Sequence, residues 1–177
     1  GKVSEIAKRA EIGKGTIYEY YDSKEHIFKE LVELFFREIF AQFKNIVNTQ
    51  ISPTEKMNKL IDRTFDFYDE FSEKESIKQM SMLFEAFVYS FRESLKDKNT
   101  IELDKIFQRF YDTIQPILDE GVKKGVFKDY PPEYLSYILF GMLDGFSIHY
   151  FLQRNNYNKE RCKEITKNIL LDGLLAK

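Results

Sequence analysis

Hydrogen-bonding side chains are concentrated near the start of the chain, in residues 14–25, which read KGTIYEYYDSKE. Lys14 and Thr16 can reach base edges or phosphate oxygens. Gly15 lies between them and has no side chain to hold the backbone away from a ligand. This combination favours close contact with a polyanion.

Three further side chains extend the same chemistry. Tyr18 and Tyr20 carry hydroxyl groups that could donate to phosphate oxygens. Lys24 lies where a long helix should begin, beside free backbone N–H groups and the positive end of the helix dipole, which together bind anions. We therefore expect a phosphate-binding position at Lys24.

Two short helices should position these residues. The first covers residues 3–10 and the second residues 14–21, with a three-residue turn between them. Two short helices joined by such a turn form a helix-turn-helix, whose second helix enters the DNA major groove. The residues expected to pack inward are Ile6, Ala7, Ile17 and Tyr21.

A long helix should follow the opening motif. Apolar residues recur at spacings of three and four from Ile27 to Val47, which is typical of an amphipathic helix. Either Asp22 or Ser23 should cap its start, and Glu25 is placed as the capping-box partner of Asp22. Such a helix could join a small N-terminal unit to a separate body.

The remaining pattern predicts an all-α protein. Ser52, Pro53 and Glu55 form a strong helix start, Gly125 should end a helix in a left-handed conformation, and Asn158 should cap the last helix. Further helices are expected over 53 to about 73, from 76, from 99 or 100, over 131–153 and over 158–175. We predict two domains: a helix-turn-helix over 1–26, truncated at its N-terminus, and a helical ligand-binding and dimerisation bundle over 27–177.

Bulk composition is compatible with a globular protein. The chain has 177 residues, 43% of them hydrophobic, with 17 Phe and 11 Tyr. Its 27 basic and 29 acidic residues give a net charge of −2, so any nucleic-acid contact must be local. No run approaches the roughly 20 apolar residues of a membrane span. The single Cys162 excludes an internal disulfide and fits the cytoplasm.

Catalytic and metal sites have weak support in the sequence. His26 and His149 lie far apart, and neither has a neighbouring cysteine or acidic cluster at metal-ligand spacing. There is no glycine-rich phosphate loop and no nucleophile with an evident base. We therefore expect no metal, no cofactor and no enzymatic activity.

The stretch VSEIAKRAEIGKGTIYEYYDSKEHIF, residues 3–28, resembles the DNA-binding region of the tetracycline-repressor (TetR) family of bacterial transcriptional regulators. The rest of the chain is similar in style, including EGVKKGVFKDYPPEYLSYILFGMLDGF at 120–146. The resemblance implies a base-reading face at Lys14, Gly15 and Thr16. It implies phosphate contacts at Tyr18, Tyr20 and Lys24.

Three departures from the family pattern have physical consequences. Glu11 stands where the family has a turn glycine, which should cost up to about 1 kcal/mol if the residue needs a left-handed backbone. Gly13 replaces a serine cap, a small loss because glycine caps nearly as well. The family also has a helix before Val3, so we expect the natural protein to carry a preceding segment.

The resemblance also implies a ligand pocket in the helical body. Aromatic walls and adaptable methionines suit a small hydrophobic ligand, although any single one of these residues is more often a core residue than a ligand contact. The expected lining residues are Phe65, Tyr68, Met80, Phe84, Phe87, Phe107, Phe110 and Tyr111.

The last two helices are expected to form a homodimer interface. Gly141 and Gly145 are four residues apart and permit close helix approach, and the neighbouring apolar surface exceeds what one packing partner would cover. A dimer would place two recognition helices on a palindrome. The expected interface residues are Gly141, Gly145, Phe146, Ile165, Ile169, Leu170 and Leu174.

These features together predict a dimeric repressor that binds a palindromic DNA operator and is released by a small apolar or aromatic ligand. The first alternative is a helical small-molecule binding or catalytic bundle whose N-terminal motif is only structural. The second is an architectural DNA binder that responds to no ligand.

Overall fold

The computed structural model describes residues 3–70, 81, 84, 85, 88, 92, 103–153 and 158–176. This part of the chain is helical, and its one β-type pairing is an isolated bridge between Phe127 and Leu175. The predicted all-α fold is therefore confirmed. The helices are α1 (Val3–Arg9), α2 (Lys14–Tyr20), α3 (Lys24–Val47), α4 (Pro53–Glu70), α6 (Leu103–Lys123), α7 (Pro132–Gln153) and α8 (Lys159–Leu174).

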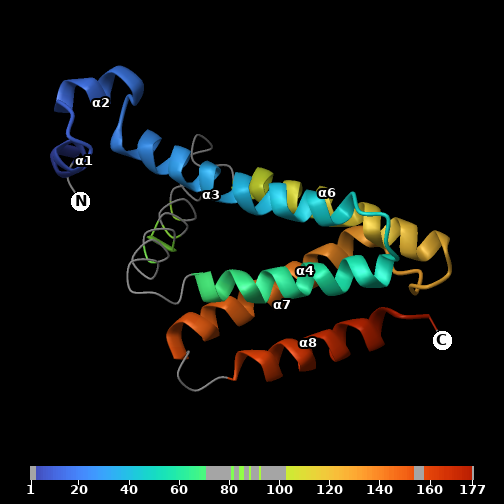
Figure 1. Ribbon diagram of the computed structural model, residues 1–177. Coiled ribbons are helices and arrows are strands. Elements are labelled where there is room, and N and C mark those ends of the chain that lie inside the picture. The colour runs from blue at the N-terminus through green and yellow to red at the C-terminus, as the bar shows by residue number, and fades with distance from the viewer. Residues whose placement is uncertain are drawn as a thin grey trace.

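The long helix α3 connects the two ends of the molecule. In Figure 1, α1 and α2 lie together at one end, and α3 runs from them into the bundle of the other helices. Within that bundle α3 packs against α6 and α4, α6 packs against α7, and α4 packs against α8. No helix in the described ranges is long and apolar enough to cross a membrane.

The observed starts of α4 and α8 match those predicted from the sequence. The Ser52 hydroxyl accepts from the Glu55 N–H at 3.2 Å, while the Glu55 carboxylate accepts from the Ser52 N–H at 3.0 Å, which is the predicted capping box. Asn158 caps α8 by accepting from the Arg161 N–H at 3.0 Å. The local hydrogen bonds that define these ends are encoded within four residues.

The start of α3 decides between the two expected caps and corrects the expected role of Glu25. Ser23, not Asp22, is the N-cap, because its side chain accepts from the His26 N–H at 3.0 Å. With Ser23 as the cap, position N3 is His26, so Glu25 does not take the predicted capping-box role.

Two glycines, Gly121 in the last turn of α6 and Gly125 just after it, shape the connection to α7. Gly125 has φ +67°, the predicted left-handed stop. The ring of Phe127, which is buried, packs directly onto Gly121, and a Cβ there would overlap the ring. The end of α8 docks on this turn, because the Lys128 N–H donates to the Leu174 carbonyl at 2.8 Å.

Two separate apolar clusters form the interior. The larger one joins α3, α4, α6, α7 and α8, with Phe65, Ile61 and Ile117 essentially inaccessible to solvent. The smaller one consists of Val3, Ala7 and Ile17, with Tyr21 and Ile27 packed against it.

The smaller cluster corrects the expected packing of α1. Ala7 is buried as predicted, but Ile6 is 37% exposed, and Val3 occupies the inward position beside Ala7. Val3 and Ala7 are four residues apart, so they share one face of the helix.

Candidate DNA-binding edge and ligand cavity

Helix α2 has a buried residue on one side and an exposed polar edge on the other. Ile17 is 4% exposed and holds the helix against α1, while Lys14 and Gly15 face solvent. Tyr18 and Tyr20 are 46% and 73% exposed. An exposed edge of cationic, hydroxyl and glycine positions on an anchored helix can approach a nucleic-acid groove.

Side chains on this edge also contact one another. The Lys14 ammonium lies 5.7 Å from the centroid of the Tyr18 ring, a cation–π distance. Thr16 is partly buried, and its hydroxyl oxygen would contact a Cβ at Gly13 at an ordinary 3.6 Å. The edge therefore carries the Lys14 ammonium against the Tyr18 ring, and the exposed Tyr20 side chain at the end of the helix.

The turn before α2 is left-handed at Glu11, with φ +57°. The Ile12 N–H donates to the Ala7 carbonyl at 3.0 Å, which closes α1 in a Schellman-type turn. The sequence prediction that Glu11 stands at a position favouring glycine is confirmed. Gly13 caps α2 with extended backbone and has no side chain to accept a hydrogen bond.

Lys24 takes a less open position than expected. Its side chain is partly buried, and its ammonium lies 5.1 Å from the centroid of the Phe28 ring, one turn further along α3. Beside it, the His26 ring meets the Tyr21 ring edge-on at 5.6 Å, which ties the end of the helix-turn-helix to α3.

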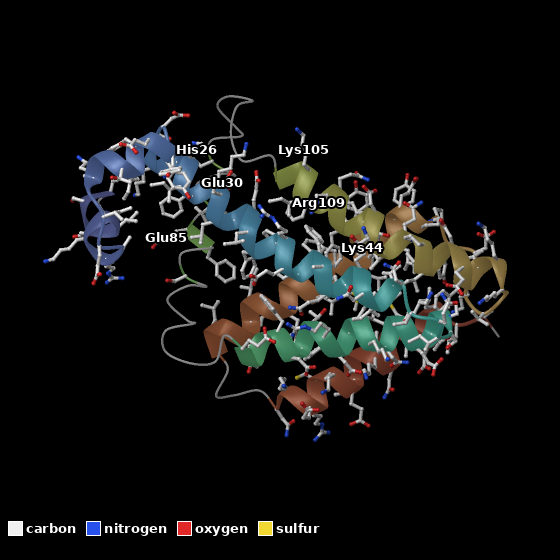
Figure 2. The ribbon with its side chains drawn as sticks, turned by 45° about the horizontal axis from the view of Figure 1, so that its top comes forward. His26, Glu30, Lys44, Glu85, Lys105 and Arg109 are labelled. Carbon is white, nitrogen blue, oxygen red and sulfur yellow. The ribbon has the colours of Figure 1, made fainter. Side chains whose placement is uncertain are left out.

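A cavity of about 670 Å³ opens at this junction. Its walls come from the first turns of α3, from described residues of the segment 81–92, and from the end of α7. Figure 2 shows Glu85 beside the part of α3 that is marked by His26 and Glu30. The lining residues are Lys24, Glu25, Phe28, Ser81, Phe84, Glu85, Val88, Arg92 and Leu152.

The predicted lining residues separate into three groups. Phe84 lies at this cavity. Phe65, Phe110 and Tyr111 are instead core residues, at most 9% exposed, and Phe107 is partly buried against the ring of Phe140 at 5.3 Å. Met80, Phe87 and the side chain of Tyr68 lie outside the described residues.

A second cavity, in the centre of the bundle, is too small for a ligand. It has a volume of about 20 Å³, and Phe110 and Leu139 are among its walls. Such a volume holds about one water molecule. The aromatic residues of the central bundle therefore fill a core in this structure.

The residues predicted for the dimer interface differ in their exposure to solvent. Ile165 and Ile169 are 47% and 58% exposed, and Gly141 is also exposed. Leu170 and Leu174 are buried in the core of their own chain, so they cannot face a second copy. Phe146 is likewise used internally, with its ring centroid 4.9 Å from that of Phe65. Gly145 is partly buried.

Sequence reasoning missed Lys24 and Leu152 as cavity residues. They lie at opposite ends of the chain, and nothing in the spacing around either one indicates that they meet. Leu152 is 76% exposed, an unusual state for a leucine at the end of an apolar helix, but exposure becomes visible only after folding.

The N-terminal part of the chain, which includes α1 and α2, is similar to known proteins. The sequence pattern of the bacterial regulatory proteins of the tetR family matches residues 1–31. The chain is also 21% identical over 175 residues to YhgD, an uncharacterised helix-turn-helix-type transcriptional regulator of Bacillus subtilis, which covers 97% of this chain and 84% of that protein. Residues 1–31 thus carry the N-terminal, DNA-binding pattern of the TetR family.

Solved structures of other regulators share the fold of this chain. FadR from Bacillus subtilis, a transcriptional regulator crystallised with stearoyl-CoA, superimposes with a TM-score of 0.75 at 19% identity, covering 98% of this chain and 88% of that one. A proposed fatty acid metabolism regulator of Clostridium perfringens gives 0.72 at 26% identity, covering 100% and 90%. Together with the match over residues 1–31, these similarities support a transcriptional regulator in which a helix-turn-helix is joined to a helical body.

Proposed function

We propose that this protein is a repressor that binds a palindromic DNA operator as a homodimer and leaves it when an apolar ligand binds. The observation that carries the DNA-binding part is the edge of α2, where Lys14, Gly15 and Tyr20 face solvent while Ile17 anchors the helix. Residues 1–26 act as the DNA-binding domain and residues 27–177 as the ligand-binding and dimerisation domain.

The contacts to DNA divide by chemistry. Lys14, Gly15 and Thr16 read base edges, because they lie at the start of the recognition helix. Tyr18, Tyr20 and Lys24 contact phosphates, and these contacts set affinity and register without carrying sequence information.

The dimer uses the outer faces of α7 and α8. The residues that support it are exposed and apolar, or small enough for close approach: Tyr137, Ile138, Gly141, Met142, Ile165 and Ile169. Isolated apolar side chains on a surface are ordinary, and the support for an interface is that α7 and α8 each expose more than one of them. Leu170 and Leu174 are left out of the proposed interface because they stabilise the protomer itself.

The ligand is an apolar molecule with an acyl chain. A cavity of about 670 Å³ lies within the range of small-molecule sites, and Phe28, Phe84, Val88 and Leu152 supply apolar walls. Two structurally similar proteins support a ligand with an acyl chain: one was crystallised with stearoyl-CoA, and the other is a proposed regulator of fatty acid metabolism.

Selection from genomic DNA fragments tests the proposal. The protein in its natural length would be mixed with fragments at about 0.15 M salt, where screening limits purely electrostatic binding. Enrichment of one palindrome, with two half-sites about one helical turn apart, is the expected result. Recovery that depends only on fragment length would contradict sequence-specific regulation.

A further inference from the structure

We propose that the cavity at the junction binds an amphipathic anion through Lys24, so that the ligand and a DNA phosphate compete directly for the same ammonium group. This inference rests on the proposed function, because it takes Lys24 as a phosphate contact. It adds where the ligand head group binds and how binding there is communicated to DNA.

The first step is that one lysine belongs to both surfaces. Lys24 is the first residue of α3 and follows the recognition helix by only four residues. It is also a wall of the cavity, together with Phe28 on the next turn. Its ammonium lies 5.1 Å from the centroid of the Phe28 ring, so the side chain is directed along α3 toward the cavity wall.

The second step concerns the sign of the ligand charge. Four charged residues line the cavity: Lys24, Glu25, Glu85 and Arg92. Formally they cancel, but Lys24 is partly buried while the other three are exposed. Water and salt screen exposed charges most strongly, so the lysine has the largest effect on a ligand inside the cavity. An anionic head group is therefore favoured over a neutral or cationic one.

The third step concerns the ligand body. Val88 and Leu152 are 64% and 76% exposed at the cavity, and Phe28 and Phe84 complete an apolar wall. An alkyl chain lying between them would bury this surface, which the hydrophobic effect favours. The cavity thus combines an apolar wall with one partly buried cation, which is complementary to a chain that ends in a carboxylate or phosphate.

The consequence is competition, in addition to any movement of α3. An ammonium paired with a ligand carboxylate inside the cavity cannot neutralise a DNA phosphate at the same time. Thermodynamic linkage then requires DNA to weaken ligand binding by the same factor by which the ligand weakens DNA binding.

Calorimetry without DNA tests the cavity. The probes are dodecanoate, dodecanol and dodecylamine, which share one alkyl chain and differ in head-group charge, each kept below its micelle-forming concentration. Dodecanoate should bind tightest, and Lys24→Met should weaken it about tenfold while leaving dodecanol unchanged. Lys29→Met removes an exposed lysine from the same helix, away from the cavity, and should change neither.

A second variant tests the location. Val88→Glu places a carboxylate on the exposed cavity wall, where it should weaken dodecanoate and spare dodecylamine. Equal binding of dodecanoate and dodecanol by the unmodified protein would overturn the inference, as would full dodecanoate affinity in Lys24→Met.

Competition is then measured with a duplex of arbitrary sequence at low salt, since a phosphate contact does not require an operator. Saturating dodecanoate should weaken duplex binding by the unmodified protein about tenfold and have no further effect on Lys24→Met. An equal effect on both proteins would overturn competition. Failure of the ligand-free protein to bind any duplex would contradict the proposed function, while the calorimetric comparison still tests the cavity.

Discussion

Lys56 on α4 and Glu120 on α6 form an ion pair across the bundle, with 2.9 Å between the Lys56 Nζ and a Glu120 carboxylate oxygen. The Lys56 side chain is only 9% exposed and that of Glu120 is 29% exposed. Lys124, one turn after Glu120, binds the other carboxylate oxygen at 2.6 Å. One carboxylate therefore pairs with a buried lysine through one oxygen and with an exposed lysine through the other.

Because Lys56 is the more buried partner, removing Glu120 and removing Lys56 should change the free energy of unfolding by different amounts. Glu120→Gln should lower the free energy of unfolding by about 1–3 kcal/mol, because it leaves the Lys56 charge buried without its carboxylate. Lys56→Met should cost less, since it removes the charge that needs a partner. Lys124→Met is the exposed control and should change stability by less than about 1 kcal/mol. Urea unfolding measures all three, and a larger loss for Lys56→Met than for Glu120→Gln would contradict this assignment.

Low pH should remove the contribution of the Glu120 carboxylate to the free energy of unfolding. Hydrogen bonds from Lys124 and then Lys56 lower the pKa of Glu120 below its ordinary value. A lowered pKa in the folded state means that the stabilisation is complete above the unfolded pKa of about 4.3 and is lost as the pH falls through the folded value. The difference in unfolding free energy between the unmodified protein and Glu120→Gln should stay constant from about pH 7 to pH 5 and shrink below about pH 4.3. Urea unfolding across this range measures it, and a difference that shrinks near neutral pH would point to another group.

The left-handed turn at Glu11 predicts a stabilising substitution. Glu11→Gly should raise the free energy of unfolding by up to about 1 kcal/mol, because φ +57° carries a steric cost for any residue with a Cβ. Glu11→Ala is the matched control, since it removes the carboxylate and keeps the Cβ. Equal gains from both substitutions would assign the effect to charge and not to backbone strain. Thermal unfolding followed by circular dichroism is sufficient for the comparison.

Substitutions at two adjacent residues of α8 should distinguish an effect on dimer assembly from an effect on folding. Ile169 is 58% exposed and Leu170 is 8% exposed. Ile169→Glu should dissociate the proposed dimer in sedimentation experiments while the protomer keeps its helical signal. Leu170→Ala should lower stability by about 2–5 kcal/mol through a core cavity. Retention of the dimer by Ile169→Glu would exclude this face of α8 from the interface.

The exposed edge of α2 predicts a change in sequence preference. Lys14→Ala should relax discrimination at one operator position by about 1–3 kcal/mol, the range for a base-reading contact. Lys24→Ala should weaken binding to all sequences and flatten the salt dependence, as expected for a phosphate contact. Affinities for operator variants at several salt concentrations distinguish the two patterns. A uniform loss on every sequence after Lys14→Ala would make Lys14 a phosphate contact instead.

Local features of this protein could be read from the order of its residues. The capping box at Ser52 and Glu55, the cap at Asn158 and the left-handed Gly125 were all predicted correctly, because the interactions that create them span no more than about one helical turn. The family pattern over residues 1–31 is equally local. The cap of α3 was left open between Asp22 and Ser23, which are both good N-caps, and the backbone conformation selected Ser23.

Long-range packing decided the rest. Phe65 and Phe84 have the same side chain on helical stretches of similar pattern, yet one is sealed in the core and the other lines the cavity. Ile169 and Leu170 are adjacent and almost equal in hydrophobicity, yet one faces solvent and the other the core. Burial depends on which distant helices cover a side chain, and core, cavity and interface draw on the same apolar residue types. The meeting of Lys24 with Leu152 at one cavity is such a consequence, because it exists only when α3 and α7 have packed into the same bundle.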